Sequence, residues 1–328
     1  IKLIEKYGAD GVRVGILLSS AAGNDLLFDE ELMLQGRNFA TKIWNSNKLI
    51  QGWKKDDSIK SNDADQQAIA WFGNQMDKTI AEIADQFEKF RISDALHLVY
   101  KLIWDDFCSW YLEAIKPNYG EAISTEVYDQ TIEYFEELMK LLHPFMPFLS
   151  EELWQNISER TVEEALVIAQ QRKVQDYDKD VIKQFEVSKE VISGVRNYRQ
   201  SKGISPREGV EVFTNATSFD NENLVRKLAN IEQIHFAEKT DKPTFSFLIG
   251  GTEVSIPLSE NLDLGQEKTK TEEEIKYLKG FMNSVDKKLS NEKFMAGAPQ
   301  QVVDNELKKK KDAQDKLILL EEKLKTLS

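Results

Sequence analysis

The residue types that most often perform chemistry are few and scattered in this sequence. It holds three histidines, His97, His143 and His235, and a single cysteine, Cys108. No two histidines lie at the spacing of metal ligands, and Cys108 falls in an apolar helical stretch where a thiol is usually buried and inert. We therefore expect structural roles for these four residues, with neither a catalytic residue nor a metal site among them.

The nearest approach to a phosphate-binding loop is the glycine series Gly8, Gly11 and Gly15. A phosphate loop follows a strand, whereas these glycines lie around and within a helical pattern. No dinucleotide fingerprint is present elsewhere. We reject a nucleotide site here and expect that the chain has no active site of its own.

A second chemistry, the binding of unstacked RNA bases, fits the helical stretch 29–51. Trp44 lies within it, together with the cations Arg37, Lys42 and Lys48. An aromatic face takes a base by stacking, while lysine and arginine meet phosphates. The alternative, favoured for Trp44, is a core stripe with a solvated opposite face. We expect the tryptophans in other strongly periodic stretches to be core residues: Trp71, Trp104, Trp110 and Trp154.

The net charge of −13 argues at face value against nucleic acid, because phosphate contacts need lysine and arginine. The charge is unevenly distributed, however. From Gly265 to Ser328 there are 14 lysines and 12 acidic residues, which leaves −15 on the preceding part. An acidic body with a nearly balanced end can still bind RNA through local patches, so the net charge alone decides nothing.

The 328 residues are enough for two or three domains. No apolar stretch approaches the roughly 20 residues that span a bilayer, and no signal peptide opens the chain. The single cysteine fits a reducing compartment. We expect a cytoplasmic protein without membrane contact, and a larger parent, because the chain opens at Ile1 without an initiator methionine.

Helical periodicity dominates the first two thirds of the chain. After short helices within 1–18, it predicts helices over 29–51, 63–90, 93–117, 126–142, 147–154 and 179–202. We take Ser93 as the N-cap of the third of these and Gly203 as the end of the last. Helices of this length joined by short loops predict an α-helical bundle.

The pattern changes near Gly209. Strands are expected over 210–213, 234–236, 245–249 and 252–258, with a helix over 221–229. Gly250-Gly251 predicts a two-residue hairpin turn between the last two strands. These elements make a small α/β module.

The end of the chain has the seam of an antiparallel two-helix coiled coil. Apolar residues step by three and four in two runs, with Gly297 and Pro299 between them: Ile275, Leu278, Met282, Val285 and Leu289, then Leu317, Leu320, Leu324 and Leu327. Helices of about 25 residues would be roughly 40 Å long. Because Glu306 and Lys310 also fall on core positions, we expect a partly polar seam.

Four stretches of the first part resemble class I aminoacyl-tRNA synthetases. Residues 7–13 with 21–25 are similar to the segment near their KMSKS loop, and Gly36–Asn45 to the first helix of their anticodon-binding bundle. Asp106–Glu113 and His143–Trp154 resemble later bundle segments shared by the valine, isoleucine and leucine enzymes. The turn segments Lys288–Phe294 and Ala298–Val303 are similar to the arm of bacterial valyl-tRNA synthetases, which narrows the resemblance to that family.

The resemblance implies a mainly α fold in four parts. Residues 1–26 would end the region adjoining a catalytic domain, 27–205 form the helical anticodon-binding domain, 206–262 the α/β module, and 263–328 the coiled-coil arm. The bundle would bind the anticodon stem-loop of tRNA-Val and the arm the outer corner of the tRNA. DNA and membranes are not expected partners, and the protein is expected to be a monomer.

The same resemblance implies that the chemistry lies elsewhere. The family's adenylation reaction uses a HIGH motif and a KMSKS loop, and neither occurs here; the editing domain is also absent. The intact parent would use ATP, Mg²⁺ and valine, and this chain is expected to bind none of them.

The predicted tRNA contacts fall into three groups. The motif helix carries Arg37, Asn38, Lys42 and Asn45, and the last bundle helix carries Arg196 and Arg199. The arm carries Lys287, Lys288, Lys293, Lys308, Lys309, Lys310 and Lys311. The lysines would equally suit a solvated coiled-coil face. Two alternatives remain open: the arm serves protein interaction or dimerisation, or the parent is an isoleucine or leucine enzyme.

Overall fold

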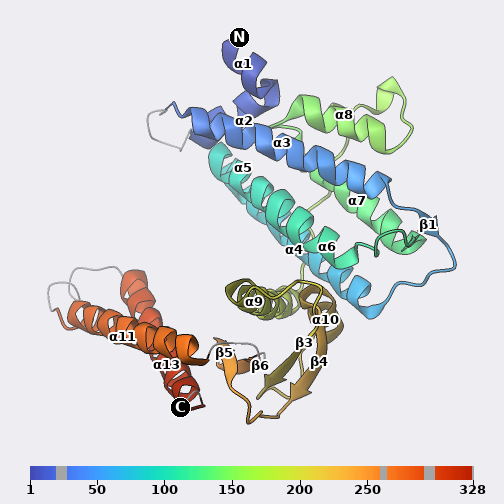
Figure 1. Ribbon diagram of the computed structural model, residues 1–328. Coiled ribbons are helices and arrows are strands. Elements are labelled where there is room, and N and C mark those ends of the chain that lie inside the picture. Colours follow the sequence, from blue (N-terminus) through green and yellow to red (C-terminus); the bar gives the residue numbers. More distant parts are fainter. Residues whose placement is uncertain (20–27, 259–263, 292–299, 327–328) are drawn as a thin grey trace. The chain divides into compact units, whose positions relative to one another are not determined.

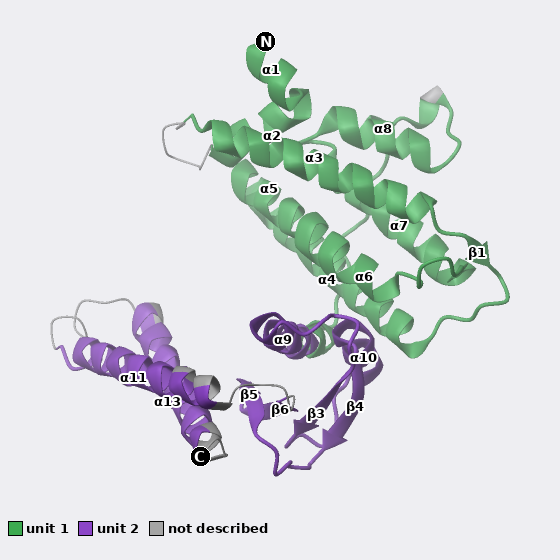
Figure 2. Cartoon of the chain, in the orientation of Figure 1, with its two compact units in different colours: residues 1–185 green, residues 186–328 purple. Residues whose placement is uncertain are grey.

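The computed structural model describes residues 1–19, 28–258, 264–291 and 300–326. The chain forms two compact units, unit 1 over Ile1–Phe185 and unit 2 over Glu186–Ser328 (Figure 2). Helix α9 (Lys179–Lys202) begins in unit 1 and continues into unit 2. The domain limits inferred from the sequence, after residues 205 and 262, stay a prediction.

Unit 1 is a helical bundle, as the sequence predicts, with α3, α4, α5 and α7 aligned along one direction (Figure 1). Its α-helices are α1 (Lys2–Tyr7), α2 (Ala9–Ser19), α3 (Glu30–Gln51), α4 (Asp63–Glu88), α5 (Ile92–Lys101), α6 (Leu112–Ile115), α7 (Thr125–Leu142) and α8 (Pro147–Ile157). Side-chain caps explain two of the starts. The Asp29 carboxylate accepts from the Glu31 amide at 2.9 Å, and Asn62 forms a capping box with Asp65 at the start of α4.

Glycines set the closest helix contact in unit 1, between α2 and α3. A β-carbon at Gly36 would lie 2.5 Å from the Gly11 carbonyl oxygen, and one at Gly15 would lie 2.7 Å from the Met33 side chain. Only hydrogen at these positions lets the two backbones approach so closely. Two glycines of the rejected phosphate-loop series, Gly11 and Gly15, therefore serve helix packing, whereas Gly8 ends α1 with a φ of 76°.

The segment from α5 to α6 differs from its prediction. Its first helix begins at Ile92 with Arg91 as N-cap, so the prediction of Ser93 as the cap is wrong. Ser93 lies inside the first turn, where its hydroxyl donates to the Leu18 carbonyl at 3.4 Å. The next ten residues, Leu102–Tyr111, form a π-helix, η1. Apolar spacing does not distinguish an i+5 ladder from an i+4 one over so short a run.

Aromatic rings fill the core of unit 1. Phe72 lies within 4.9–5.3 Å, ring centre to ring centre, of Phe107, Tyr111 and Tyr134. The Tyr111 hydroxyl, buried by these rings, is 3.0 Å from that of Thr131.

Contacts between distant segments also pair two short parallel strands that the sequence does not predict, β1 (Lys55–Asp56) and β2 (Ile123–Ser124).

Helix α2 also holds the start of α8. The buried Asp10 carboxylate accepts from the Leu149 amide at 2.7 Å, at the N-terminus of α8. Arg13 donates to the carbonyl oxygens of Pro144 and Phe145 in the preceding turn. Two stretches far apart in the sequence, both of which resemble synthetase segments, are thus joined directly.

Unit 2 contains a four-stranded sheet in the order β4-β3-β6-β5. Its elements are β3 (Val210–Thr214), α10 (Glu222–Ala229), β4 (Ile231–Phe236), β5 (Thr244–Ile249) and β6 (Thr252–Pro257). Strands β3 and β4 are parallel and the other pairs are antiparallel. Gly250 and Gly251 have φ of 56° and 94°, as a two-residue type I′ hairpin requires, and they form the predicted turn.

The end of unit 2 is a pair of helices, α11 (Leu264–Leu289) and α13 (Gln300–Thr326). Glu274 pairs with Lys316 and Asp286 with Lys310, so the two helices run antiparallel. The seam buries four of the apolar residues predicted for it, Ile275, Leu278, Val285 and Leu320, and it also buries Val303 and Ala313. It also buries Glu306, which confirms the polar character expected of it. The predicted seam residue Leu327 and the turn segments within 292–299 lie outside the described residues.

None of the helices in the described residues combines the length and the apolar composition needed to cross a bilayer.

Candidate nucleic-acid interface

A recess of about 350 Å³ opens on the exposed side of α3 in unit 1. Three of the four tRNA contacts predicted on this helix line it, Asn38, Lys42 and Asn45. They are four and three residues apart, a spacing that places side chains above one another on one helix face. The remaining lining comes from α3, η1 and α6: Thr41, Ser46, Leu49, Cys108 and Leu112.

Lys42 lies at the wall of the recess and is held by the π-helix. Its ammonium donates to the Trp104 carbonyl and to the Ser109 hydroxyl, both at 3.0 Å, and sits 4.1 Å from the centre of the Trp104 ring. Ser109 also donates to the same carbonyl at 2.9 Å. A half-buried cation with these partners keeps its charge in a fixed place.

The rim and floor of the recess differ in character. Asn38 and Asn45 are exposed at the rim and carry amides that both donate and accept hydrogen bonds. Cys108 is buried on the floor, as predicted, with its sulfur 3.1 Å from the Ser46 hydroxyl. Burial raises the pKa of the Cys108 thiol, which keeps it protonated and unreactive.

Arg37 does not line the recess, although its neighbour Asn38 does. Its guanidinium donates to the Lys6 carbonyl at 3.4 Å and therefore lies beside α1. Lys6 in turn pairs with Glu30 at 2.7 Å. Arg37 is exposed, so it belongs to a neighbouring part of the surface of unit 1.

The two α9 arginines hold unit 2 together. Arg199 is 4% exposed, and its guanidinium donates to four carbonyl oxygens, those of Ser205, Glu208, Ala229 and Asn230. Burial lowers its pKa from the ordinary arginine value. Arg196 donates to the Leu228 carbonyl at 3.0 Å. Both residues thus fasten α9 to the α/β module, and a tRNA contact at either stays a prediction.

The predicted arm lysines divide into two groups. Lys288 and Lys309 pair with the buried Glu306 at 3.7 and 2.8 Å, and Lys310 pairs with Asp286 at 2.7 Å. The hydrogen bond from Lys309 holds the pKa of Glu306 below its usual range.

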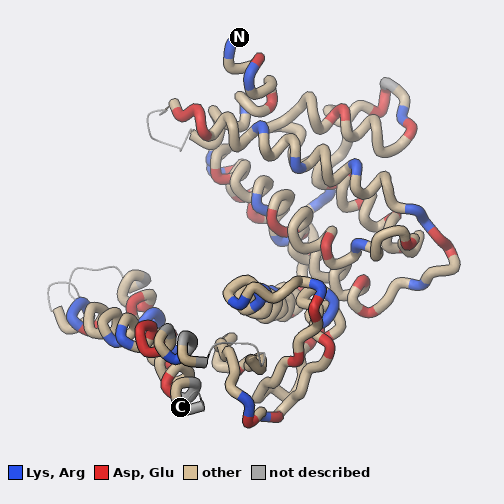
Figure 3. Tube along the Cα trace, in the orientation of Figure 1, with Lys and Arg blue, Asp and Glu red and all other residues tan. Residues whose placement is uncertain are grey.

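The pairs Lys288–Glu306 and Lys310–Asp286 cross between α11 and α13 and therefore help to fix their register, whereas Lys309–Glu306 lies within α13. Lys287, Lys308 and Lys311 are exposed and, among the described residues, make no ion pair. Lys293 lies outside the described residues. Figure 3 shows lysines and acidic residues interspersed along both helices.

Comparison with known proteins gives these surfaces a context. Residues 70–214 match the family model of the anticodon-binding domain of tRNA ligases, and residues 263–328 match that of the valyl tRNA synthetase tRNA binding arm. The chain is 47% identical to the valine–tRNA ligase of Christiangramia forsetii over 99% of its length. This chain belongs to the valine–tRNA ligase family.

Other members of the valine–tRNA ligase family align as completely. The enzyme of Phocaeicola vulgatus is 46% identical over 100% of the chain, and that of Fusobacterium nucleatum is 34% identical over 99%. The chain spans 38% and 39% of the length of these two relatives. The match of its end to the valyl arm decides against an isoleucine or leucine enzyme.

Sequence reasoning missed the residues that position the recess of this family member. Trp104 and Ser109 hold Lys42, and Ser46 and Leu112 complete the lining. Ser109 falls within the stretch that resembles the family, which is the one signal that could have drawn attention to it. Nothing in the sequence indicates that a backbone carbonyl of η1 is turned toward α3. No cluster of three or more potential metal ligands occurs among the described residues.

Proposed function

We propose that this chain is the tRNA-binding part of a valine–tRNA ligase and that its RNA is tRNA-Val. The single observation that carries this proposal is the presence, in one chain, of both an anticodon-binding domain and the valyl type of tRNA binding arm. Relatives that align over nearly the whole chain carry the name valine–tRNA ligase. The chain then contributes recognition to an enzyme that performs its chemistry elsewhere.

In this proposal the recess on α3 takes an unstacked base of the anticodon loop. The amides of Asn38 and Asn45 would hydrogen-bond to the base edge, since an amide offers a donor and an acceptor side by side. Leu49, Leu112 and the protonated Cys108 supply an apolar floor. Lys42, fixed by Trp104, adds a positive charge without side-chain entropy to lose on binding.

The helical pair of unit 2 would meet the outer corner of the tRNA. Lys287, Lys308 and Lys311 are the best candidates for phosphate contacts among the predicted residues that the structure describes, because they carry no internal ion pair there. Phosphate contacts of this kind position an RNA without reading its sequence. Specificity for tRNA-Val would therefore come from unit 1.

The activity of the whole enzyme is also a proposal. The complete protein would join valine to tRNA-Val with ATP and Mg²⁺, using parts of the relatives that this chain does not span. For the chain itself we propose binding without catalysis, in the cytoplasm and as a monomer.

The direct test is to titrate fluorescently labelled tRNA-Val with the 328-residue chain at several salt concentrations. We expect tighter binding of tRNA-Val than of an unrelated tRNA, and an affinity that falls linearly with log[salt] in a log–log plot. Equal affinity for both tRNAs would refute anticodon recognition. A chain lacking residues 264–328 is the test of the arm, provided that circular dichroism shows the remainder folded; unchanged affinity would remove the arm from the interface.

An alternative function of the arm is protein interaction. Large apolar side chains are exposed among its described residues, including Tyr277 by 71%, Leu307 by 50% and Ile318 by 53%, and such residues favour contact with another apolar surface. Light scattering distinguishes the two functions. A concentration-dependent dimer that is lost when Tyr277 and Ile318 are changed to serine would support dimerisation over a monomeric tRNA-binding arm.

A further inference from the structure

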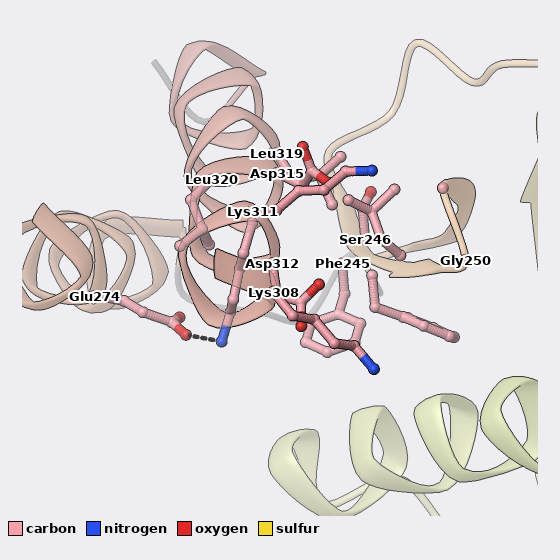
Figure 4. A pocket seen from close by; sticks show the side chains of 14 residues that line it. Phe245, Ser246, Gly250, Glu274, Lys308, Lys311, Asp312, Asp315, Leu319 and Leu320 are labelled. Atoms are coloured by element: carbon pink, nitrogen blue, oxygen red, sulfur yellow. Dashed lines mark ion pairs between the residues drawn. The ribbon is translucent and has the colours of Figure 1, made fainter. Parts of the chain in front are cut away.

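A second and larger cavity lies within unit 2, between strand β5 and helix α13 (Figure 4). Its volume is about 630 Å³, within the range of roughly 300–1,000 Å³ that ligand pockets have. Phe245 and Phe247 line one side, and Lys308, Lys311, Asp312 and Asp315 line the other. None of these residues except Lys308 and Lys311 was singled out from the sequence.

The β5 side of the cavity offers aromatic surface and backbone groups. Phe245 and Phe247 are half-buried, and Phe245 lies beside Lys308 in Figure 4. In the two-residue hairpin, Ile249 and Thr252 close the turn, so alternate residues of β5 pair with β6. Ser246 and Leu248 therefore point their N–H and C=O groups away from β6. Both residues line the cavity.

The α13 side offers charges that the fold itself does not use. Lys316 pairs with Glu274 at 2.7 Å across the helical pair (dashed in Figure 4). Lys308 and Lys311, by contrast, make no ion pair with any residue that the structure describes. They are three residues apart and therefore adjacent on the helix surface. Asp312 and Asp315, at the same spacing, also line the cavity.

We propose that this cavity receives one unstacked guanine nucleotide of the bound tRNA. The inference rests on the proposed function of the arm and names the part of the RNA that it holds. The base would stack on the phenylalanine rings, and Lys308 and Lys311 would meet the neighbouring phosphates. The carboxylate of Asp312 or Asp315 would accept hydrogen bonds from the adjacent N1–H and N2–H groups of guanine, which accounts for acidic residues beside the lysines.

An extended peptide added to the edge of β5 is the competing occupant, and the cavity is short for it. The lining part of the strand runs from Phe245 to Leu248, about 10 Å at 3.3 Å per residue. The Gly250-Gly251 turn ends the edge immediately afterwards. A typical strand needs about five or six residues. A single nucleotide uses the aromatic, basic and acidic groups together, whereas an added strand would use chiefly the backbone.

The first experiment places the nucleotide. Each unpaired purine in the corner loops of tRNA-Val is replaced by an abasic site, one at a time, and affinity for the 328-residue chain is measured. We expect one position at which the affinity falls about 5- to 150-fold, the equivalent of 1–3 kcal/mol for a stacked base. At that position, tRNA binding should also slow hydrogen exchange at the Ser246 and Leu248 amides. Small, equal effects at every position would overturn the proposal.

The second experiment tests the residues. Lys311→Ala should reduce the effect of the abasic substitution, because a nucleotide whose phosphate is held less firmly occupies the cavity less. Lys276→Ala, an equal charge change on an exposed lysine of α11 outside the cavity, should leave that effect intact. The double variant Asp312→Asn with Asp315→Asn should lose the preference for guanine over inosine at the responding position. Retained preference would exclude the carboxylates as readers.

The outcomes separate the two proposals. If removal of residues 264–328 weakens tRNA binding while Lys311→Ala behaves like Lys276→Ala, the arm binds tRNA and the cavity proposal fails alone. If removal has no effect, both fail. Protection of Ser246 and Leu248 by an extended peptide, with none by tRNA, would assign the cavity to strand addition instead.

Discussion

The recess on α3 and the surface of the helical pair use charge in opposite ways. In the recess, Lys42 is held by a carbonyl, a hydroxyl and an aromatic ring, and neutral amides stand at the rim. On the pair, Lys309 and Lys310 are held by carboxylates, and other lysines remain in solvent. The bundle is thick enough to bury a cation among uncharged partners. A two-helix seam is not, so its polar positions are neutralised by ion pairs, and what is left for a ligand is surface charge.

The same contrast governs packing, and one substitution made in both regions should have opposite effects. Gly36→Ala places a methyl group against the Gly11 carbonyl, and we expect unit 1 to lose about 2–3 kcal/mol of stability, as for an overpacked core. Gly280→Ala in α11 meets no atom within 4 Å and should stabilise that helix by about 0.5–1 kcal/mol.

All six tryptophans lie in unit 1, so their fluorescence reports the unfolding of that unit, while amide exchange in α11 and α13 reports on the helical pair. Separate probes are needed because two units need not unfold in one transition. An unchanged fluorescence midpoint in Gly36→Ala would contradict the close contact of α2 with α3.

In RNA binding, the recess should contribute affinity that salt does not remove. The double variant Asn38→Ala with Asn45→Ala should weaken tRNA-Val binding about tenfold, from two lost hydrogen bonds of about 0.5–1.5 kcal/mol each, with the salt slope unchanged. Asn156→Ala, on the exposed side of α8, is the matched control and should bind normally. If the double variant instead lowers the slope of log K against log[salt] as much as a lysine variant does, Asn38 and Asn45 do not act through hydrogen bonds to a base.

The arm lysines should show the reverse behaviour. Lys287→Ala and Lys308→Ala are each expected to lower the slope of log K against log[salt] by about 0.9 or less, with a loss of affinity of only a few-fold at high salt. Lys309→Ala, which removes a partner of Glu306, should act on the stability of the pair more than on the slope. Salt titrations of the three variants measure both quantities.

Acidification should change the contributions of one carboxyl in each region to stability in opposite directions, and this effect should be the smallest of the four predicted here. Burial raises the pKa of Asp10 in unit 1, whereas the hydrogen bond from Lys309 lowers that of Glu306. The raised pKa of Asp10 means that the fold disfavours its ionised form, so this carboxylate destabilises the fold at neutral pH and the penalty disappears as the pH falls through its folded pKa. The lowered pKa of Glu306 means that the fold favours its ionised form, so this carboxylate stabilises the fold at neutral pH and the stabilisation is lost as the pH falls through its folded pKa.

Thermal unfolding between pH 7 and 3 measures this difference. The stability gap between the native chain and Glu306→Gln, followed in α11 and α13, should narrow as the pH falls. The gap between the native chain and Asp10→Asn, followed by tryptophan fluorescence, should move in favour of the native chain. Parallel trends in the two variants would show that these carboxyls do not dominate the pH response.

Helix existence and order were predictable because their causes are local. Apolar spacing and end signals place α3, α4, α7 and α9 within one or two residues at nearly every end, and the Gly-Gly turn places the β5–β6 hairpin. The start of α5 was misassigned because Ser93 resembles a cap but bonds to Leu18 instead. The strands β1 and β2 were missed because two residues each give no pattern, and only a distant partner makes them strands.

The sequence predicted which residue types could make up the candidate site, but it did not predict which of those residues lie together and stay available to a ligand. Asn38, Lys42 and Asn45 share a face because a helix has 3.6 residues per turn, which the sequence shows. Arg199 has the same chemistry as a phosphate-binding arginine, and only burial under four carbonyls shows its structural use. Lys308 and Lys309 are exposed neighbours in one lysine run, and only the position of Glu306 shows which of them has an ion-pair partner.

The sequence alone determined the mainly α fold, the antiparallel end and the resemblance to a synthetase family, since these depend on periodicity and on motifs that neighbours in the chain carry. The tertiary structure decided which polar groups remain available to a ligand. Many of the hydrogen bonds that a lysine or arginine makes inside the fold join distant residues: Lys42 and Ser109 are 67 positions apart, and Arg13 and Phe145 are 132 positions apart. Local pattern does not contain that information, because it is created when distant segments pack.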